Sequence, residues 1–315
     1  MPRVSVLMTV YNGMPFLPEA VESLFAQTLS DFELVVVDDG STDGTGEYLA
    51  SVTDPRLRVI TRENGGTSAA ANQGLTACVG EYVARMDADD VSLPTRLAEQ
   101  AAYLDAHPEV GLVGVQMAPL GERGVGRSLA LPTSHRAIDD ALMAGRHGLG
   151  HSCIMFRAEL LRRLGGYWKL RQQDAWDMML RMGEAAELAN LDRVLHHYRV
   201  HRGSINGRGM SRLRFGIDYA RELARRRRNG LPPLSVEEYQ ANLERRPWWR
   251  RLAERVDIYA RSHYRLALAE IYGGRRARGA VRMAWAAACQ PKLTAERIGR
   301  ALGRRFRGRG TASTT

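Results

Sequence analysis

Three aspartates fall within four positions of the sequence RMDADDVSLPTRL, which spans residues 85–97: Asp87, Asp89 and Asp90. The apolar stretch GEYVARM precedes them and is typical of a buried strand. Because neighbouring carboxylates repel one another, the cluster either holds a cation or forms a polar turn that also caps the next helix. Residues i and i+2 of an extended segment project to the same side, so Asp87 and Asp89 form a pair suited to a divalent cation such as Mg²⁺. Asp90 is then free to cap the helix or to orient the loop.

Polar loops also follow the three earlier strands that the sequence predicts. Each one alone is an ordinary turn or helix cap: TVYNG (9–13), DDGSTDGT (38–45) and ENGGTSAAAN (63–72). Because the carboxyl ends of parallel strands meet at one edge of a sheet, the loops together predict a nucleotide site. The loop after the first strand lacks a GxGxxG fingerprint, and no P-loop sequence is present. A metal held by carboxylates therefore remains as the means of binding phosphates.

The elements that would position these loops alternate along the first 118 residues. Short β-branched runs predict strands buried on both faces at 4–10, 32–39, 57–63, 80–87 and 110–116. Apolar residues at helical spacing predict helices between them, at 15–28, 45–52, 67–78 and 93–107. This alternation indicates an α/β fold with a Rossmann-like, mostly parallel sheet flanked by helices and joined by right-handed crossovers.

The pattern is more mixed from residue 128 to 205. Helices are predicted at 134–145, 158–166 and 174–186, a strand at 151–157, and a short strand pair at 187–201. From about residue 211 onward helical patterns rich in Arg and Ala dominate, and residues 264–274 and 277–291 are expected to form one helical hairpin. The tail RRFRGRGTASTT, residues 304–315, is predicted to be disordered. We therefore expect a catalytic domain at 1–205 and a basic α-helical C-terminal region at 206–315.

Charge divides the 315-residue chain in the same place. Residues 1–205 carry 19 Lys+Arg and 26 Asp+Glu, a net charge of −7, whereas residues 206–315 carry 26 and 9, a net charge of +17. The three cysteines are far apart and form neither a disulfide framework nor a metal-ligand spacing, which is typical of a reducing cytosol. The sequence shows no signal peptide and no apolar run near the roughly 20 residues of a membrane span. These observations predict a cytoplasmic protein.

Three interpretations of the basic C-terminal region remain open. The simplest is that its arginines form solvated helix faces. The second is a peripheral contact with the inner face of the plasma membrane, because RPWWRRLAERV and RMAWAAACQP combine Trp with Arg as interfacial helices do. The third is binding of nucleic acid, which ranks last because no nucleic-acid-binding motif is present.

The ordered series of loops resembles the family 2 inverting glycosyltransferases, which have a GT-A fold. The resemblance is carried by VSVLMTVYNG, LVVVDDGSTDGT, NGGTSAAAN and RMDADDVSLPTRL, and it extends through HSCIMFRAELLRRLGGY, QDAWDMMLRM and YRVHRGS. It covers roughly residues 3–205 and leaves the C-terminal region outside. The resemblance implies a nucleotide-sugar donor, such as a UDP-sugar, and Mg²⁺ or Mn²⁺ as the cofactor.

The resemblance also implies roles for individual residues. It places the base, ribose and diphosphate of the donor against Thr9, Tyr11, Asn12, Asp38, Asp39, Asn64, Asn72 and Asp87. It implies that Asp87 and Asp89 bind the metal, with Asp89 as the chief ligand and His201 as a further ligand or a supporting residue. The family often has a basic residue just before the asparagine of the third loop, where this chain has Ala71.

The general base of an inverting transfer is expected in QDAWDMMLR. The family commonly has one residue between the two aspartates of this motif, whereas here two residues separate Asp174 from Asp177. We take Asp174 as the base, with Asp177 as the rival. Charge stabilisation of a helix N-terminus is the alternative explanation for both. His151 and Trp176 are candidates for contact with the acceptor, although a residue at a strand end and a packing residue would look the same in the sequence.

The sequence thus predicts a metal-dependent inverting glycosyltransferase that acts on a glycan or lipid-linked acceptor in polysaccharide or cell-surface glycan synthesis. Two alternatives belong to other classes. A sugar-phosphate nucleotidyltransferase would also place metal-binding aspartates on a Rossmann-like sheet, but the first strand is not followed by a Gly-rich, basic triphosphate loop. A non-enzymatic basic membrane- or nucleic-acid-associated protein would not need Asp39, Asp87, Asp89 and Asp174 together.

Overall fold

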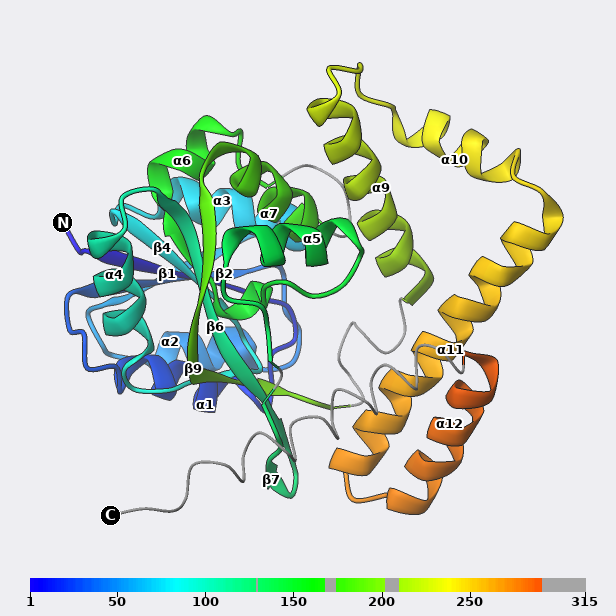
Figure 1. Cartoon of the computed structure of the whole chain (residues 1–315). Helices are drawn as coiled ribbons and strands as arrows, with labels where there is room; N and C mark the ends of the chain where they lie inside the picture. Colours follow the sequence, from blue (N-terminus) through cyan, green and yellow to red (C-terminus); the bar gives the residue numbers. More distant parts are fainter. Residues whose placement is uncertain (129, 168–173, 202–209, 291–315) are drawn as a thin grey trace, which may run out of the picture. The chain divides into compact units, whose positions relative to one another are not determined.

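The computed structural model describes residues 1–128, 130–167, 174–201 and 210–290 (Figure 1). Its strands are β1 (Val4–Val10), β2 (Phe32–Asp38), β3 (Leu57–Thr61), β4 (Tyr82–Asp87), β5 (Val91–Ser92), β6 (Val110–Gly121), β7 (Gly124–Val125), β8 (Met155–Arg157) and β9 (Glu187–Arg199). The helices of the catalytic region are α1 (Leu17–Phe25), α2 (Thr45–Ser51), α3 (Thr67–Ala77), α4 (Arg96–Ala106), α5 (His135–Met143), η1 (His151–Cys153), α6 (Ala158–Arg163) and α7 (Asp174–Ala185). The helices that follow are α9 (Met210–Arg228), α10 (Val236–Glu244), α11 (Trp248–Tyr272) and α12 (Arg276–Cys289).

The described strands form one sheet in the order β3-β2-β1-β4-β8-β6-β9-β5, with β7 paired to β6. The neighbouring pairs among β3, β2, β1 and β4 are parallel, and β6 is parallel to β9. Strand β8 runs antiparallel to both β4 and β6. The predicted α/β class and mostly parallel sheet are confirmed, and the helices α9 to α12 confirm a helical C-terminal region.

Two helical layers cover the parallel strands. Val4, Val6, Met8 and Val10 of β1 lie on one face, where the core also contains apolar residues of α1, α2 and α4. On the other face α3 approaches so closely that a Cβ added to Gly74 would lie 2.2 Å from Leu7 Cδ1. Figure 1 shows α3 and the pair α1 and α2 on opposite sides of the sheet. Burial on both faces explains why these strands appear in the sequence as continuous apolar runs.

Two local predictions are corrected by the structure. Residues 187–201 do not form a strand pair, because β9 is a single strand. On β6, Val115 pairs with Leu191 of β9, but the next residue, Gln116, pairs with Val194. The exposed residues Asp192 and Arg193 of β9 therefore form a bulge instead of a turn. Residues 151–157 are not one strand either, since the 3₁₀ turn η1 precedes the short strand β8.

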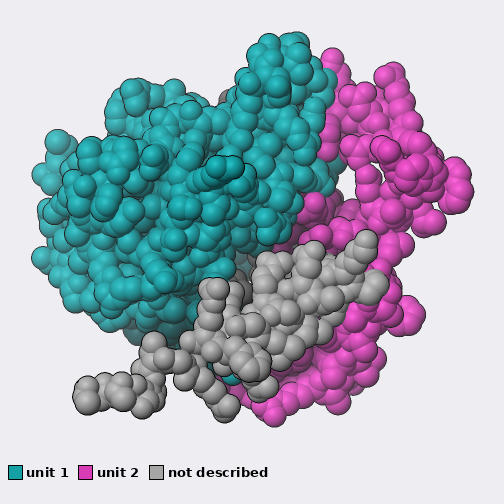
Figure 2. All heavy atoms as spheres, viewed as in Figure 1, with its two compact units in different colours: residues 1–120, 124–199, 215–234 teal, residues 121–123, 200–214, 235–315 magenta. Residues whose placement is uncertain are grey.

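The chain divides into two compact units (Figure 2). Unit 1 comprises residues 1–120, 124–199 and 215–234, and unit 2 comprises residues 121–123, 200–214 and 235–315. In unit 2 the predicted helical hairpin is confirmed: α11 and α12 pack together, and a Cβ on Gly279 would lie 2.5 Å from Ile271 Cγ1. The predicted boundary between residues 205 and 206 stays a prediction, and the tail at 304–315 lies outside the described residues. No helix in the described ranges is long and apolar enough to cross a membrane.

Candidate active site

The strand register brings the polar loops of unit 1 to one edge of the sheet. Val10, at the end of β1, pairs with Asp38 at the end of β2, and Thr9 pairs with Asp87 at the end of β4. Asp38 also pairs with Thr61 at the end of β3. The loops after all four parallel strands therefore leave the sheet side by side, as the sequence predicted.

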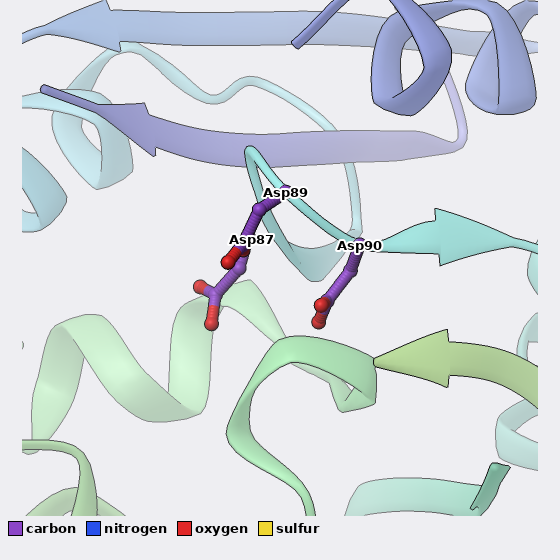
Figure 3. Close-up of side chains that lie close together, drawn as sticks. All are labelled: Asp87, Asp89 and Asp90. Atoms are coloured by element: carbon purple, nitrogen blue, oxygen red, sulfur yellow. The ribbon is translucent and has the colours of Figure 1, made fainter. Parts of the chain in front are cut away.

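Asp87, Asp89 and Asp90 form a carboxylate cluster at this edge (Figure 3). One carboxylate oxygen from each residue lies within 4.8 Å of the others. Asp87 ends β4, and the other two residues belong to the tight loop before β5. The side chain of Asp87 remains 47% exposed, so a ligand can reach the cluster. Within the described part of the chain, no other group of three or more His, Cys, Asp or Glu side chains has this spacing.

Two of the three carboxyl groups have strongly shifted acidities. Burial of the carboxyl group raises the pKa of Asp87 to about 7, and the negative charges of Asp90 and Asp89 add to the effect. Burial also raises the pKa of Asp90 to about 7, and Asp89 is the next largest cause. Asp87 keeps an open side, so we read its shift as the result of close carboxylates as well as of lost water. Clustered carboxyls of this kind fit a site that compensates them with a cation.

Asp90 is held from β9. Its Oδ1 accepts a hydrogen bond from the backbone N–H of Arg199 at 2.8 Å, and its Oδ2 lies 2.8 Å from Nε2 of the fully buried His196. Burial holds the pKa of His196 well below its usual range, and the charge of Arg96 lowers it further. Since Arg96 donates to Nδ1 of His196, the neutral ring carries its proton on Nε2 and donates to Asp90. Asp90 thus orients the loop, which agrees with the role predicted for it.

Arg96 connects three parts of unit 1 behind the carboxylates. The side chain is fully buried, and burial lowers its pKa to about 10. Its guanidinium donates to His196 Nδ1 at 3.1 Å, to the Ser152 carbonyl at 3.2 Å and to the Arg85 carbonyl at 3.1 Å. These bonds join the start of α4 to β4, η1 and β9, so the scaffold of the aspartate loop is fixed from three sides.

Arg85 is a second buried arginine at the site. It donates to the Leu7 carbonyl at 3.2 Å and to Thr9 Oγ1 at 3.4 Å, and it lies 3.8 Å from the Asp87 carboxylate. Among the described residues its Nε atom has no hydrogen-bond partner. Because the positive charge of Arg85 is buried close to Asp87, it reduces the repulsion among the carboxylates of Asp87, Asp89 and Asp90. Arg85, Arg96 and His196 were missed in the sequence, although an arginine within the apolar run YVARM was a usable clue.

The first two loops are joined by hydrogen bonds. Asn12 adopts a positive φ of 54°, and its side-chain oxygen accepts from the backbone N–H of Thr42 at 2.8 Å. Its own N–H donates to Ser41 Oγ at 2.8 Å. Tyr11, beside it, is exposed. The predicted role of Asn12, Tyr11 and Thr9 in binding the donor stays a prediction, and the structure gives Asn12 a loop-building role as well.

The second and third loops are joined through Asp39. Its carboxylate accepts hydrogen bonds from the backbone N–H groups of Gly65 at 3.0 Å and Gly66 at 2.8 Å, and it lies 3.2 Å from Arg62. Asp38 accepts from the backbone N–H of Ser41 at 3.0 Å. Both aspartates are buried, so each shapes the loop around the predicted nucleotide site.

The two asparagines predicted at the third loop have different surroundings. Asn64 is exposed. Asn72 lies on α3 and forms two hydrogen bonds with the backbone of Tyr167: it donates to the carbonyl at 2.7 Å and accepts from the N–H at 2.8 Å. The Asn72 side chain therefore anchors the segment after α6. Their contacts with a nucleotide stay predictions.

Asp177 is fully buried in an ion-pair network. Its Oδ2 accepts from Arg181 Nε at 2.7 Å and its Oδ1 from Arg227 Nη1 at 3.1 Å. Arg181 also donates to the carbonyls of Leu164 and Gly166. A carboxylate enclosed by two arginines has no open side for an acceptor hydroxyl, which disfavours Asp177 as general base, but the choice between Asp174 and Asp177 stays a prediction. Asp174 begins α7, but its side chain lies outside the described part.

The two acceptor candidates also differ. Trp176 is 4% exposed, its indole N–H donates to the Leu142 carbonyl at 3.3 Å, and its ring lies in a T-shaped arrangement with that of His147. An acceptor sugar would need an open ring face, which the buried Trp176 does not offer here, and its role as an acceptor contact stays a prediction. His151 lies on η1 with Nε2 3.4 Å from the Tyr167 hydroxyl. Burial holds the pKa of His151 well below its usual range. Its contact with an acceptor, and the metal role of His201 in unit 2, stay predictions.

Several known proteins are similar in sequence to part of this chain. The model of the family described as Glycosyl transferase family 2 matches residues 5–165. The Amylovoran biosynthesis glycosyltransferase AmsE of Erwinia amylovora is 33% identical over 65% of this chain and 79% of its own length. The O-antigen biosynthesis glycosyltransferase WbnJ of Escherichia coli is 30% identical over 64% of this chain and 81% of its own length. The Putative glycosyltransferase EpsE of Bacillus subtilis (strain 168) is 36% identical, but the match covers only 62% of EpsE.

Solved structures share the fold. S. aureus TarS 1-349 in complex with UDP-GlcNAc superposes with a TM-score of 0.60 at 19% identity and covers 93% of this chain and 82% of that chain. The likeness indicates a GT-A fold and says nothing more at such low identity. The match to the family model spans more than half of the chain and includes the aspartate cluster and the four polar loops. The chain therefore belongs to glycosyl transferase family 2 and is a glycosyltransferase.

Proposed function

We propose that this glycosyltransferase moves a sugar from a UDP-sugar to a glycan or lipid-linked acceptor, with inversion at the anomeric carbon, in the synthesis of a polysaccharide or cell-surface glycan. The observation that carries the proposal is the cluster of Asp87, Asp89 and Asp90 beside the loops at the strand ends. The names of AmsE and WbnJ refer to amylovoran and O-antigen biosynthesis, and TarS is described in complex with UDP-GlcNAc. Family membership decides against the nucleotidyltransferase and the non-enzymatic alternatives.

The residues present fit a divalent cation. The cluster offers only oxygen ligands, which Mg²⁺ and Mn²⁺ prefer, and its exposed side leaves room for phosphate oxygens of the donor. PcManGT, a mannosyltransferase from Pyrobaculum calidifontis described in complex with GDP-Man and Mn²⁺, has a TM-score of 0.55 with this chain at 22% identity, covering 97% of this chain and 81% of that chain. We assign Asp87 and Asp89 as the ligands. His201 as a further ligand is implied only by the resemblance to the family. A bound cation would neutralise the diphosphate as it leaves.

The remaining steps belong to side chains of the chain itself. Asp38, Asp39 and the loops that they shape would hold the nucleotide, while His196 and Arg96 keep Asp90 and its loop in place. In the transfer, the acceptor hydroxyl oxygen bonds to the anomeric carbon as the bond to the diphosphate oxygen breaks. The Asp174 carboxylate takes the hydroxyl proton. We assign this catalysis to residues 1–205. We also propose that the protein acts in the cytoplasm.

A donor screen tests the proposal. Purified protein would be incubated with Mg²⁺ or Mn²⁺ and a panel of UDP-, GDP- and dTDP-sugars, and both thermal shift and nucleotide release would be recorded. We expect a metal-dependent response that is largest for one UDP-sugar. A response to GDP-sugars alone would contradict the donor class, and no metal-dependent response to any donor would contradict the proposal as a whole.

Metal binding is expected to depend on pH. The metal-free protein holds protons on Asp87 and Asp90 up to about pH 7, and the cation must displace them. The rise in Tm produced by Mg²⁺ should therefore be smaller at pH 6 than at pH 8. The stability of the metal-free protein should change with pH in the opposite direction to metal binding. The stabilisation from the two raised pKa values is complete below the unfolded pKa of about 4 and is lost as the pH rises through 7. Equal Mg²⁺ shifts at the two pH values would contradict this prediction.

Replacement of His196 with alanine is expected to weaken metal binding about 10- to 100-fold, which is typical when a residue that orients a metal ligand is lost. The physical reason is that Asp90 loses the N–H that holds its Oδ2, and Asp90 in turn orients the loop that carries the proposed metal ligand Asp89. Isothermal titration with Mn²⁺ measures the affinity, and circular dichroism checks the fold. His197→Ala is the matched control, since His197 is the neighbouring residue on β9 and makes no bond to Asp90. Equal affinities of the two variants would refute the role of His196.

A further inference from the structure

The first half of α11 exposes large apolar side chains. Trp248 is 70% exposed and Trp249 is 54% exposed, and the exposed set continues with Leu252, Val256 and Tyr259. Each helical residue advances by about 100°, so these positions fall on one side of the helix. We call these five residues the apolar stripe. Single exposed apolar residues are ordinary, but a contiguous set on one helix face marks an interaction surface.

The length of α12 explains why the apolar stripe is uncovered. Helix α11 has 25 residues and α12 has 14, which correspond to about 38 Å and about 21 Å. The hairpin connection brings α12 back along the second half of α11, where Ala260 and Ala267 are buried. The remaining length of α11, about 17 Å, is that of the stripe. Within the described residues of unit 2, the stripe therefore continues a packed face beyond the end of its covering helix.

The charges around the apolar stripe are almost all positive. Residues 245–290 contain 11 arginines and three acidic residues. Each acidic residue already forms an ion pair with an arginine of the same hairpin region: Glu254 with Arg246, Asp257 with Arg261 and Glu270 with Arg282. The guanidinium of Arg250 lies over the ring of Trp249, with 5.0 Å between Cζ and the ring centroid. Residues 245–290 thus carry a net charge of +8, and Arg250, Arg251 and Arg255 lie on the same stretch of α11 as the stripe.

This combination selects one class of partner. A second copy of the hairpin would bring two strongly positive surfaces together, which is unfavourable at low ionic strength. The segment 291–315 is also a poor cover, because its sequence contains seven basic residues and one acidic residue. Nucleic acid would match the charge, but the aliphatic side chains of Leu252 and Val256 have no role in binding phosphates. A surface that is both anionic and apolar below its charged layer matches both features.

We propose that the apolar stripe and the arginines around it dock unit 2 on a membrane surface that contains anionic lipids. The tryptophan, leucine and valine side chains enter the boundary between headgroups and acyl chains, and the arginines contact lipid phosphates. The inference gives the basic C-terminal region a function and identifies where the predicted peripheral contact is made. Only its purpose, access to a lipid-linked acceptor, rests on the proposed function.

Co-sedimentation with vesicles tests the proposal on the full chain without any sugar donor. The vesicles contain either phosphatidylcholine alone or an equal mixture of phosphatidylcholine and phosphatidylglycerol. We expect binding to the mixed vesicles that falls with added salt, and little binding to phosphatidylcholine. The double variant Trp248→Ser, Trp249→Ser should lower the vesicle partition constant by about tenfold or more, because two interfacial anchors are lost. The matched control is Trp285→Ser, since Trp285 on α12 is 54% exposed but outside the stripe.

The outcomes separate this inference from the proposed function. Equal binding by the Trp248→Ser, Trp249→Ser variant and the Trp285→Ser variant would overturn the stripe as the docking surface. Equal binding to both kinds of vesicle would overturn the anionic selectivity. A stable dimer that the double variant converts into a monomer would show that the stripe contacts a second copy instead. Donor-dependent nucleotide release should remain unchanged in both variants. A failed vesicle test would therefore leave the glycosyltransferase proposal intact, and a failed donor screen would leave the vesicle result valid.

Discussion

Replacement of Asp89 with asparagine is expected to lower turnover by about 10³-fold or more, since it removes one of the charges proposed to hold the cation. The loop itself should keep its shape. Arg199 Nε donates to the backbone carbonyl of Asp89 at 2.7 Å, and the Arg199 N–H donates to Asp90, and neither bond involves the Asp89 carboxylate. The Mg²⁺-induced rise in Tm should be lost as well, while the metal-free Tm changes little. Steady-state kinetics with the donor from the screen and thermal shift in Mg²⁺ or EDTA measure the two effects.

An exposed aspartate on the same sheet provides the control for the Asp89 variant. Asp192 lies in the bulge of β9 and is exposed, so Asp192→Asn changes the net charge equally without touching the cluster. It should retain both turnover and the Mg²⁺ response. If Asp89→Asn also retained both, the cluster would not be the metal site, and the conflict between three close carboxylates would need another compensation.

The site edge could be predicted from the sequence because two simple rules apply to it. Buried parallel strands appear as continuous apolar runs, and β1, β2 and β4 begin and end within two residues of the predicted bounds. Once the strands are parallel, the loops at their carboxyl ends must share an edge. The register then places Asp38 and Asp87 on either side of the end of β1. No long-range contact has to be known in advance for this step.

The scaffold behind the aspartates could not be predicted in the same way. His196 and Arg96 are 100 residues apart, and their contact depends on β9 lying beside β5 and on the position of α4. A buried arginine also contradicts the general preference of charged residues for the surface. The chain tolerates Arg85 and Arg96 because backbone carbonyls, a neutral histidine and nearby carboxylates accept or offset their charges. Such compensation exists only in three dimensions.

Burial is a further property that a motif does not reveal. Trp176 and Asp177 have the residue types that sugar stacking and base catalysis require. Yet Trp176 is buried with its N–H bonded to the Leu142 carbonyl, and Asp177 lies between two arginines. A sequence pattern records residue identity and spacing on α7. It does not record which side of that helix packs against α9, because that depends on Arg227, 50 residues away. We therefore keep Asp174 as the proposed base.

Replacement of Asp174 with asparagine is expected to lower kcat by about 10²- to 10⁴-fold, the usual contribution of a general base. Asparagine has almost the same shape and cannot accept a proton, so donor affinity and Tm should change little. The variant should also retain the Mg²⁺-induced rise in Tm, which distinguishes it from Asp89→Asn. Acceptor-dependent turnover and donor binding by calorimetry, measured separately, test whether the loss falls on the chemical step.

Asp177→Asn is the matched comparison, because it makes the same change one helical turn away. Asp177→Asn should mainly lower stability, because Arg181 and Arg227 each lose an ionic partner. The free energy of unfolding should fall by about 2–3 kcal/mol. This loss is smaller than for a fully buried ion pair, because Arg227 is partly exposed. Turnover of the fraction that remains folded should stay close to that of the unchanged protein. If Asp177→Asn lost turnover while folded and Asp174→Asn retained it, the assignment of the base would be reversed. Asp177 would then have to leave both arginines in each catalytic cycle, which would require α7 and α9 to separate.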